Sequence, residues 1–124
     1  MKCMRAKKFL MGFQDGSDPS FLRSVEVQVI SREACKKSYD GWFDIFITSR
    51  MVCAGVPEGG KGPCNGDSGG ALVLKKSGKQ VGIVSWGHGC AEKEYPEVFT
   101  NLADKEIQDF IGEELKQAAN VSLF

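Results

Sequence analysis

The chain has 124 residues, which leaves room for one domain with a hydrophobic core of its own. It contains 16 Lys and Arg and 16 Asp and Glu, so its formal charge is zero, which argues against a nucleic-acid or membrane-surface partner. No apolar run approaches the ~18 residues of a membrane span. The 15 glycines and 42% hydrophobic residues indicate a loop-rich β protein.

The N-terminal segment does not fit a secretion signal. Residues 1–8 are basic, but the apolar run that follows, Phe9 to Phe13, is shorter than the ~7–15 residues of a signal-peptide hydrophobic region. Residues 1–10, with Cys3, therefore stay unassigned. From Gln14 to Ser20 the Asp, Gly, Ser and Pro content predicts a turn-rich loop.

A strand, a helix and a long loop are predicted next. From Ser24 to Ile30, valines alternate with polar residues, which indicates a strand with one buried face. Ser31 is suited to cap a short helix from Arg32 to about Tyr39. The loop at 40–48 carries aromatic side chains that either lie exposed near a binding groove or pack beneath the loop; these are Trp42, Phe43 and Phe46.

The stretch from Cys64 to Ala71 has the composition of a catalytic turn. Ser68 stands between glycines and directly after Asp67, which suits a hydroxyl raised out of a tight turn. The amides of Gly66 and Ser68 are placed to converge on one point, as an oxyanion hole requires. The alternative is a glycine-rich turn in which Asp67 and Ser68 bond their own backbone.

The sequence of the C-terminal half predicts three further strands and a helix. Leu72 to Leu74 and Val81 to Val84 flank a turn at 75–79 and indicate a hairpin. Val98 to Leu102 predicts another strand. An apolar stripe at helical spacing should then dock a terminal helix onto the barrel; it consists of Ile107, Phe110, Ile111 and Leu115. A glycosylation sequon begins at Asn120 and is usable only in a secreted chain.

Several motifs occur in an order and spacing that resemble one family. Besides Gly-Asp-Ser-Gly-Gly, they are Met51 to Gly55, Gly82 to Gly87, Gly89 to Ala91 and Pro96 to Thr100. Together they resemble the C-terminal half of the trypsin/chymotrypsin-like serine proteases. The resemblance implies an all-β fold, a six-stranded antiparallel β-barrel with a short intermediate helix and a C-terminal α-helix. It places this half-domain at residues 11–118, followed by a tail at 119–124.

Five cysteines in so short a chain suggest an oxidising compartment, although their number alone does not distinguish disulfides from free thiols. By the resemblance, Cys35 pairs with Cys53 and Cys64 with Cys90, each bridge contributing roughly 3 kcal/mol on the chain-entropy model. The family also implies secretion. Because no signal peptide accompanies it, we interpret the chain as a truncated product. We expect no cofactor or metal, since His88 near Cys90 is too little for a zinc site.

The resemblance implies hydrolysis of peptide or protein substrates by a serine nucleophile. Ser68 would attack the scissile carbonyl, the Gly66 and Ser68 amides would stabilise the oxyanion, and Ser85, Trp86 and Gly87 would pair with the substrate backbone. The family's catalytic His and Asp lie in the N-terminal barrel, and nothing in this sequence matches them. His88 is expected to be a solvent-facing loop residue. Without a base, the chain alone should be almost inert.

Asp67 lacks its family partner as well. In active members, the carboxylate at this position pairs with a new N-terminal ammonium after proteolytic activation. No matching N-terminus occurs here, so Asp67 should turn toward solvent or find another donor, leaving the oxyanion hole partly formed.

The specificity pocket departs from the trypsin pattern. Gly62 occupies the position of the pocket floor, where trypsin-type members carry aspartate, and Tyr39 resembles the aromatic residue that borders the pocket. Glu97 stands against the pocket wall, where the family usually has a small residue. It either accepts Arg or Lys side chains, fills the pocket, or turns out to solvent.

Two functions from different classes remain open. The first is the nucleophile-bearing half of a secreted serine endopeptidase, which needs the missing barrel. The second is a non-catalytic binding or decoy protein that uses the pocket and the aromatic loop. In both cases an apolar face should be exposed, which favours docking of the missing barrel or self-association.

Overall fold

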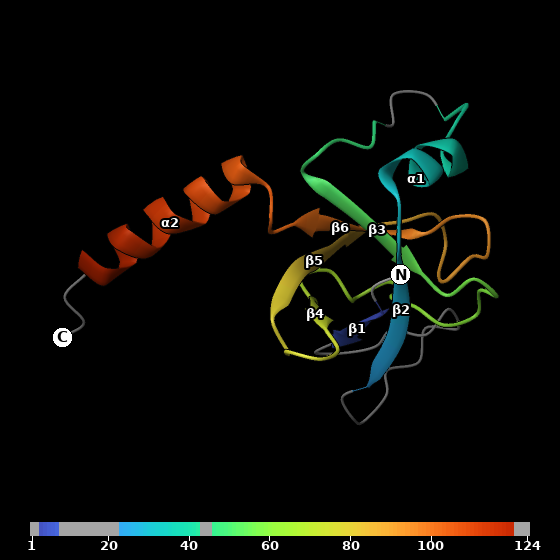
Figure 1. Cartoon of the computed structure of the whole chain (residues 1–124), viewed down its shortest axis with the longest axis horizontal. Coiled ribbons are helices and arrows are strands. Elements are labelled where there is room, and N and C mark those ends of the chain that lie inside the picture. Colours follow the sequence, from blue (N-terminus) through green and yellow to red (C-terminus); the bar gives the residue numbers. More distant parts are fainter. Residues whose placement is uncertain (1–2, 8–22, 43–45, 121–124) are drawn as a thin grey trace.

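The part of the chain that the structure describes forms a closed β-barrel with one short and one long helix (Figure 1). The computed structural model describes residues 3–7, 23–42 and 46–120. The predicted loop at 14–20, Phe43 and the end of the sequon lie outside the described residues. Neither described helix is long and apolar enough to cross a membrane.

Six antiparallel strands form the barrel in the order β1-β2-β3-β6-β5-β4, with β4 pairing back to β1. Their bounds are β1 Cys3–Lys7, β2 Ser24–Ile30, β3 Met51–Gly55, β4 Ala71–Leu74, β5 Gln80–Trp86 and β6 Glu97–Asn101. This confirms the predicted fold class and the predicted strand at 24–30. It also gives residues 3–7, which the sequence left unassigned, a place in the barrel between β2 and β4.

The alternating pattern of β2 explains how the barrel core forms. Val27 is buried and Val25 and Val29 pack against the same cluster, while Glu26 points outward and pairs with Lys75 at 2.9 Å. Alternate residues of a strand lie on opposite faces, so the valines line the interior. Among the described side chains, the buried members of this core are Val27, Ala54, Leu72 and Phe99, from β2, β3, β4 and β6.

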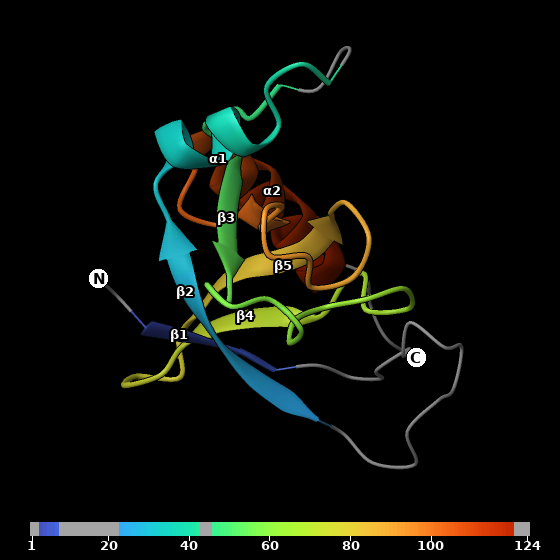
Figure 2. The same ribbon diagram turned by 90° about the vertical axis from the view of Figure 1, so that its right-hand side faces the viewer.

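Helix α1 (Arg32–Ser38) lies over one end of the barrel, as the two views show (Figures 1 and 2). It begins as predicted, because the Ser31 hydroxyl accepts a hydrogen bond from the Ala34 amide at 3.2 Å. A disulfide from Cys35 to Cys53 joins α1 to β3. A second buried cluster forms around this bridge; its members are Cys35, Tyr39, Ile47, Cys53 and Val98.

Helix α2 (Lys105–Asn120) extends away from the barrel (Figure 1). The prediction that its apolar stripe docks on the barrel is wrong, because none of its residues is buried and Phe110 and Leu115 are 61% and 65% exposed. Only its first turn is anchored, by an ion pair between Arg50 and Glu106 and by the Gln108 side chain donating to the Leu102 carbonyl. The stripe therefore has no counterpart among the described residues.

Candidate active site

Ser68 lies at the tip of a tight turn between β3 and β4. The Asp67 amide donates to the Cys64 carbonyl at 3.0 Å, and the Gly70 amide donates to the Asp67 carbonyl at 2.9 Å. Gly66 and Gly69 have φ values of +88° and +86°, which glycine adopts without strain. The result is an exposed serine on a backbone that is fixed on both sides.

Two connections hold this turn against β5. The Gly69 amide donates to the Val84 carbonyl, and the Val84 amide donates to the Gly70 carbonyl. The disulfide from Cys64 to Cys90 joins the start of the turn to the loop that follows β5. Both disulfides expected from the resemblance are thus present in the structure.

A cleft of about 270 Å³ opens beside Ser68. It brings together most of the residues that the sequence singled out: Ser68, Gly66, Ser85, Trp86, Gly87 and Glu97. They come from the 64–70 turn, the end of β5 and the start of β6. The remaining lining is uncharged, with Pro63, Cys64, Asn65, Val84 and Gly89.

The backbone around the cleft offers unused hydrogen-bonding groups. The Gly66 and Ser68 amides donate to no other described residue, so both stay available for a ligand oxygen. Strand β4 pairs with β5 only as far as Ile83, and a register shift separates Val84 from Trp86 on the β6 side. Residues 85–87 therefore run along the cleft with one edge open to an added strand.

Asp67 is buried, with 2% of its surface exposed, and its Oδ2 accepts a hydrogen bond from the Cys64 amide at 2.6 Å. Of the two expectations for this carboxylate, turning toward solvent is wrong and finding another donor is what the structure has. A carboxylate that accepts a backbone N–H within its own turn also braces that turn. Asp67 does not line the cleft.

Glu97 is the buried carboxylate that does face the cleft. It is 6% exposed, which rules out the alternative in which it turns out to solvent. Its Oε1 accepts a hydrogen bond from the Ala91 amide at 3.2 Å. Burial raises the pKa of Glu97 to about 7, and the Ala91 hydrogen bond opposes part of that shift. Near neutral pH the side chain is thus divided between its neutral and charged forms.

Gly62 and Tyr39 lie behind the cleft and do not line its surface. Gly62 is buried between Ala91 and Glu97, 3.2 Å and 3.9 Å from where its missing Cβ would stand. The Tyr39 hydroxyl donates to the Pro96 carbonyl at 2.8 Å, and burial raises the pKa of Tyr39 to about 12. Both residues support the wall that carries Glu97.

His88 is exposed, as expected, but its ring belongs to an aromatic cluster. Its centroid lies 4.6 Å from that of Trp42 and 4.5 Å from that of Tyr95, both edge to face. Trp42 also contacts Tyr39 and remains 39% exposed, whereas Phe46 is 73% exposed. Each of the two alternatives for the loop aromatics thus holds for one residue: Trp42 packs against neighbouring rings, and Phe46 is exposed to solvent.

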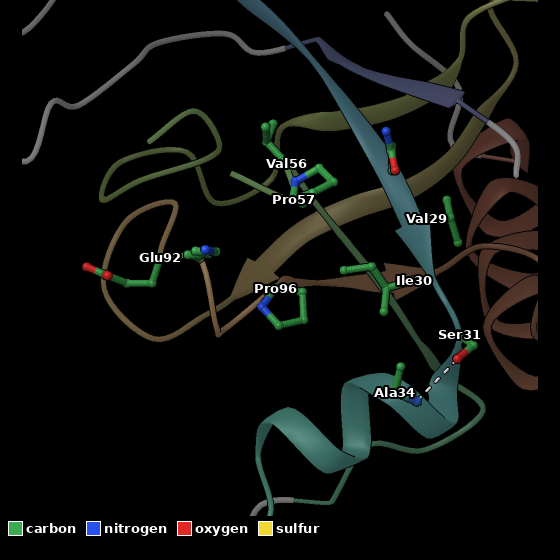
Figure 3. Close-up of a pocket in the computed structure, with 11 residues that line it drawn as sticks. Val29, Ile30, Ser31, Ala34, Val56, Pro57, Glu92 and Pro96 are labelled. Atoms are coloured by element: carbon green, nitrogen blue, oxygen red, sulfur yellow. Dashed lines mark hydrogen bonds between the residues drawn. The ribbon is translucent and has the colours of Figure 1, made fainter. Parts of the chain in front are cut away.

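A second hollow lies on the other side of the loop that leads into β6 (Figure 3). It measures about 550 Å³ and is lined mainly by apolar side chains of β2, α1 and the segments after β3 and before β6, including Ile30, Ala34, Val56 and Pro96. Pro96 faces this hollow while Glu97 faces the cleft. The hollow contains neither the nucleophile nor a buried charge, so the smaller cleft is the candidate active site.

One contributing residue escaped the sequence analysis. Ala91 has a φ of +56°, which is unusual for a residue with a side chain, and its amide holds Oε1 of Glu97. Nothing in the sequence signals this conformation. No group of three or more potential metal ligands occurs among the residues that the structure describes.

The fold and the cleft define a chain that belongs to the trypsin family, whose sequence pattern, described as Trypsin, matches residues 5–111. Among individual relatives, it is 52% identical over 90 residues to the vitellin-degrading protease of Bombyx mori, which covers 73% of this chain and 33% of that protein. It is 47% identical over 88 residues to trypsin of Sus scrofa, covering 71% of this chain and 36% of that one. With trypsin-1 of Astacus astacus the identity is 46% over 92 residues, or 73% and 38% of the two chains.

These matches add two facts to the geometry. The chain spans 33% to 38% of the length of the three relatives. The family pattern begins at residue 5, inside β1, so the likeness extends further toward the N-terminus than the sequence motifs indicated.

Proposed function

We propose that this chain supplies the nucleophile, the oxyanion hole and the substrate-binding strand of a secreted serine endopeptidase, and that the general base is carried by polypeptide outside the sequence given. The observation that carries the proposal is the cleft, which gathers Ser68, the free Gly66 amide and the open edge of residues 85–87. The two disulfides and the relatives, all named as proteases, support extracellular proteolysis.

Each part of the cleft has a role in the proposed reaction. The substrate backbone pairs with residues 85–87, which brings its carbonyl beside Ser68. The serine oxygen attacks the carbonyl carbon, its proton passes to the base, and the Gly66 and Ser68 amides stabilise the oxygen that becomes negative. The base then returns the proton to the leaving amine. A water molecule then attacks the acyl group on Ser68 with the same base accepting its proton, and the acid product leaves as the serine regains its proton.

No residue of this sequence matches the catalytic histidine that acts as the general base in the family. Its one histidine, His88, packs edge to face against Trp42 and Tyr95. Loss of the base from a serine protease lowers turnover by about 10⁶, or roughly 8 kcal/mol of transition-state stabilisation. The chain alone should therefore be almost inert.

Labelling with a fluorophosphonate tests this proposal. The probe reacts with an activated serine, so the chain alone should label at least ~10⁴-fold more slowly than a fusion that places the N-terminal part of the Sus scrofa trypsin before it. In the fusion, Ser68→Ala should abolish labelling. Ser77→Ala, in the exposed hairpin turn, is the matched control and should label normally.

Rapid labelling of Ser68 in the chain alone would overturn the requirement for an external base. A folded fusion that never labels would overturn the catalytic proposal itself. That second outcome would favour the alternative, a binding or decoy protein. The exposed side chains of Trp42 and Phe46 support this alternative, because they are available to contact a partner. Peptide binding would then be weakened by Phe46→Ala and unaffected by Ser68→Ala.

A further inference from the structure

Helix α2 ends on a motif that the proposed reaction does not use. Asparagine occurs at Asn65, Asn101 and Asn120, and only Asn120 begins an Asn-x-Ser tripeptide, with Val121 and Ser122. This tripeptide is the acceptor of N-linked glycans in secreted chains, provided that the middle residue is not proline. The sequence therefore contains one acceptor position for an N-linked glycan.

The structure leaves the Asn120 side chain accessible. Asn120 is exposed and is the last residue of α2, which extends away from the barrel (Figure 1). No described residue accepts a hydrogen bond from its amide. Asn101 differs, because its side-chain amide donates to the Ser49 carbonyl at 2.9 Å and its side-chain oxygen accepts a hydrogen bond from the Ala103 amide at 3.1 Å. A glycan acceptor must present a free amide nitrogen, and Asn120 does so.

Asn120 lies on the polar face of α2. At about 100° per residue, it is about 180° around the helix from Ile111 and about 140° from Ile107 and Leu115. Phe110, the nearest member of the apolar stripe around the axis, is about 80° away and nearly three turns earlier. The residues that share the face with Asn120 are exposed and charged: Asp109, Glu113 and Lys116. A group attached to Asn120 is therefore directed away from the apolar stripe.

We infer that Asn120 carries an N-linked glycan, and that this glycan covers the polar face of α2 while the apolar stripe stays open to contact. The inference rests on secretion, which is part of the proposed function. The two disulfides support the same oxidising compartment.

The modification joins an oligosaccharide to the side-chain amide. The donor is an oligosaccharide attached to a lipid through a pyrophosphate, which the secretory pathway supplies. A bond forms between Nδ2 of Asn120 and the anomeric carbon of the sugar, and the bond from that carbon to the pyrophosphate oxygen breaks. The amide loses one proton as the lipid pyrophosphate leaves. The product is a neutral amide, so the glycan acts on α2 through its bulk and its solubility.

Expression of the full chain in insect cells, behind an added signal peptide, tests the site. We expect a slower-migrating band that peptide N-glycosidase removes, with the asparagine at position 120 converted to aspartate by that enzyme and located by mass spectrometry. Asn120→Gln and Ser122→Ala should each abolish the slower band. Ser122→Thr preserves the tripeptide and should keep it.

A displaced acceptor tests which face the glycan covers. Ala118→Asn combined with Asn120→Ser moves the tripeptide back by two residues, to about 20° from Ile107 and Ile111 around the helix. The glycan then lies over the apolar stripe, so this glycoform should bind at least ~2-fold less hydrophobic dye than the chain glycosylated at Asn120. The same double variant, made in cells whose glycosylation is blocked, is the control. It should bind as much dye as the unaltered chain made in the same way.

Absence of a glycan at Asn120 in the chain recovered from cells and medium would overturn the inference. Equal dye binding by the two glycoforms, including no binding by either, would overturn the open apolar stripe opposite the glycan. Neither measurement needs proton transfer at Ser68. A glycosylated chain whose fusion never labels would therefore contradict the proposed reaction alone, and a fusion that labels but carries no glycan would contradict only this inference.

Discussion

The barrel and helix α2 contain similar apolar side chains and use them differently. Phe99, Leu72 and Val27 are almost completely buried inside the barrel, whereas Phe110 and Leu115 on α2 remain mostly exposed. Strand pairing closes the barrel around its own core, while α2 is tied down only at its first turn. Apolar periodicity thus predicts that a segment is helical. It does not predict whether another surface is present to cover the apolar face of that helix.

The largest expected effect separates these two regions directly. Phe99→Ala removes a fully buried ring from the barrel core and should destabilise the chain by about 3–5 kcal/mol. Urea unfolding followed by tryptophan fluorescence measures it. A loss below about 1 kcal/mol would mean that the barrel is no better packed than α2.

The next effect concerns the covalent tie of the nucleophile turn. Replacing Cys64 and Cys90 together by serine removes a bridge between residues 26 apart and should lower stability by about 3 kcal/mol on the chain-entropy model. Thermal unfolding under non-reducing conditions gives the value. An unchanged midpoint would show that the turn is held by its hydrogen bonds to Val84 alone.

Glu97 makes the stability of the barrel sensitive to pH. Its pKa in the folded chain is about 7 against an ordinary value of 4.5, so the folded state holds an extra proton between these limits. The stability it contributes is complete below pH 4.5 and is lost as pH rises toward 7, by at most about 3 kcal/mol. Measuring the free energy of unfolding against pH for the unaltered chain and for Glu97→Gln isolates the contribution of Glu97. The same pH dependence in both proteins would contradict the prediction.

The smallest effect on stability is expected on α2. Phe110→Ser changes an exposed side chain and should shift the free energy of unfolding by less than about 0.5 kcal/mol. The same change should reduce self-association, measured by light scattering, and binding of a hydrophobic dye. If the unsubstituted chain is monodisperse and binds no dye, the prediction that the exposed apolar side chains of α2 promote self-association is wrong.

Much of the fold could be predicted because its signals are local. The alternating valines of β2, the Ser31 cap and the turn between β4 and β5 each act over a few residues, and the structure has all three. The docking of α2 depends on distant surface, so its stripe gave the wrong answer. β1 lacks a clear pattern of its own and is defined by its pairing with β2 and β4.

The candidate site follows the same rule. The nucleophile turn could be predicted from its own glycine-flanked residues, and the disulfide pairs from the resemblance to the trypsin/chymotrypsin-like serine proteases. The state of Glu97 could not, since it depends on Gly87, Gly62 and the unusual backbone of Ala91, which meet only in the folded chain. From the sequence, the Glu97 side chain could bind Arg or Lys, fill the pocket or turn out to solvent. Its burial in the structure excludes the last of these.

Strand β1 has a consequence for how the molecule meets its own copies. Because β1 (Cys3–Lys7) pairs with both β2 and β4, neither of those two strands has a free edge to which the backbone of another copy can add. Strand addition between copies is thereby confined to the short open edge at residues 85–87. Deleting residues 3–7 would bare two unsatisfied strands at once and turn a sticky protein into one prone to form fibrils.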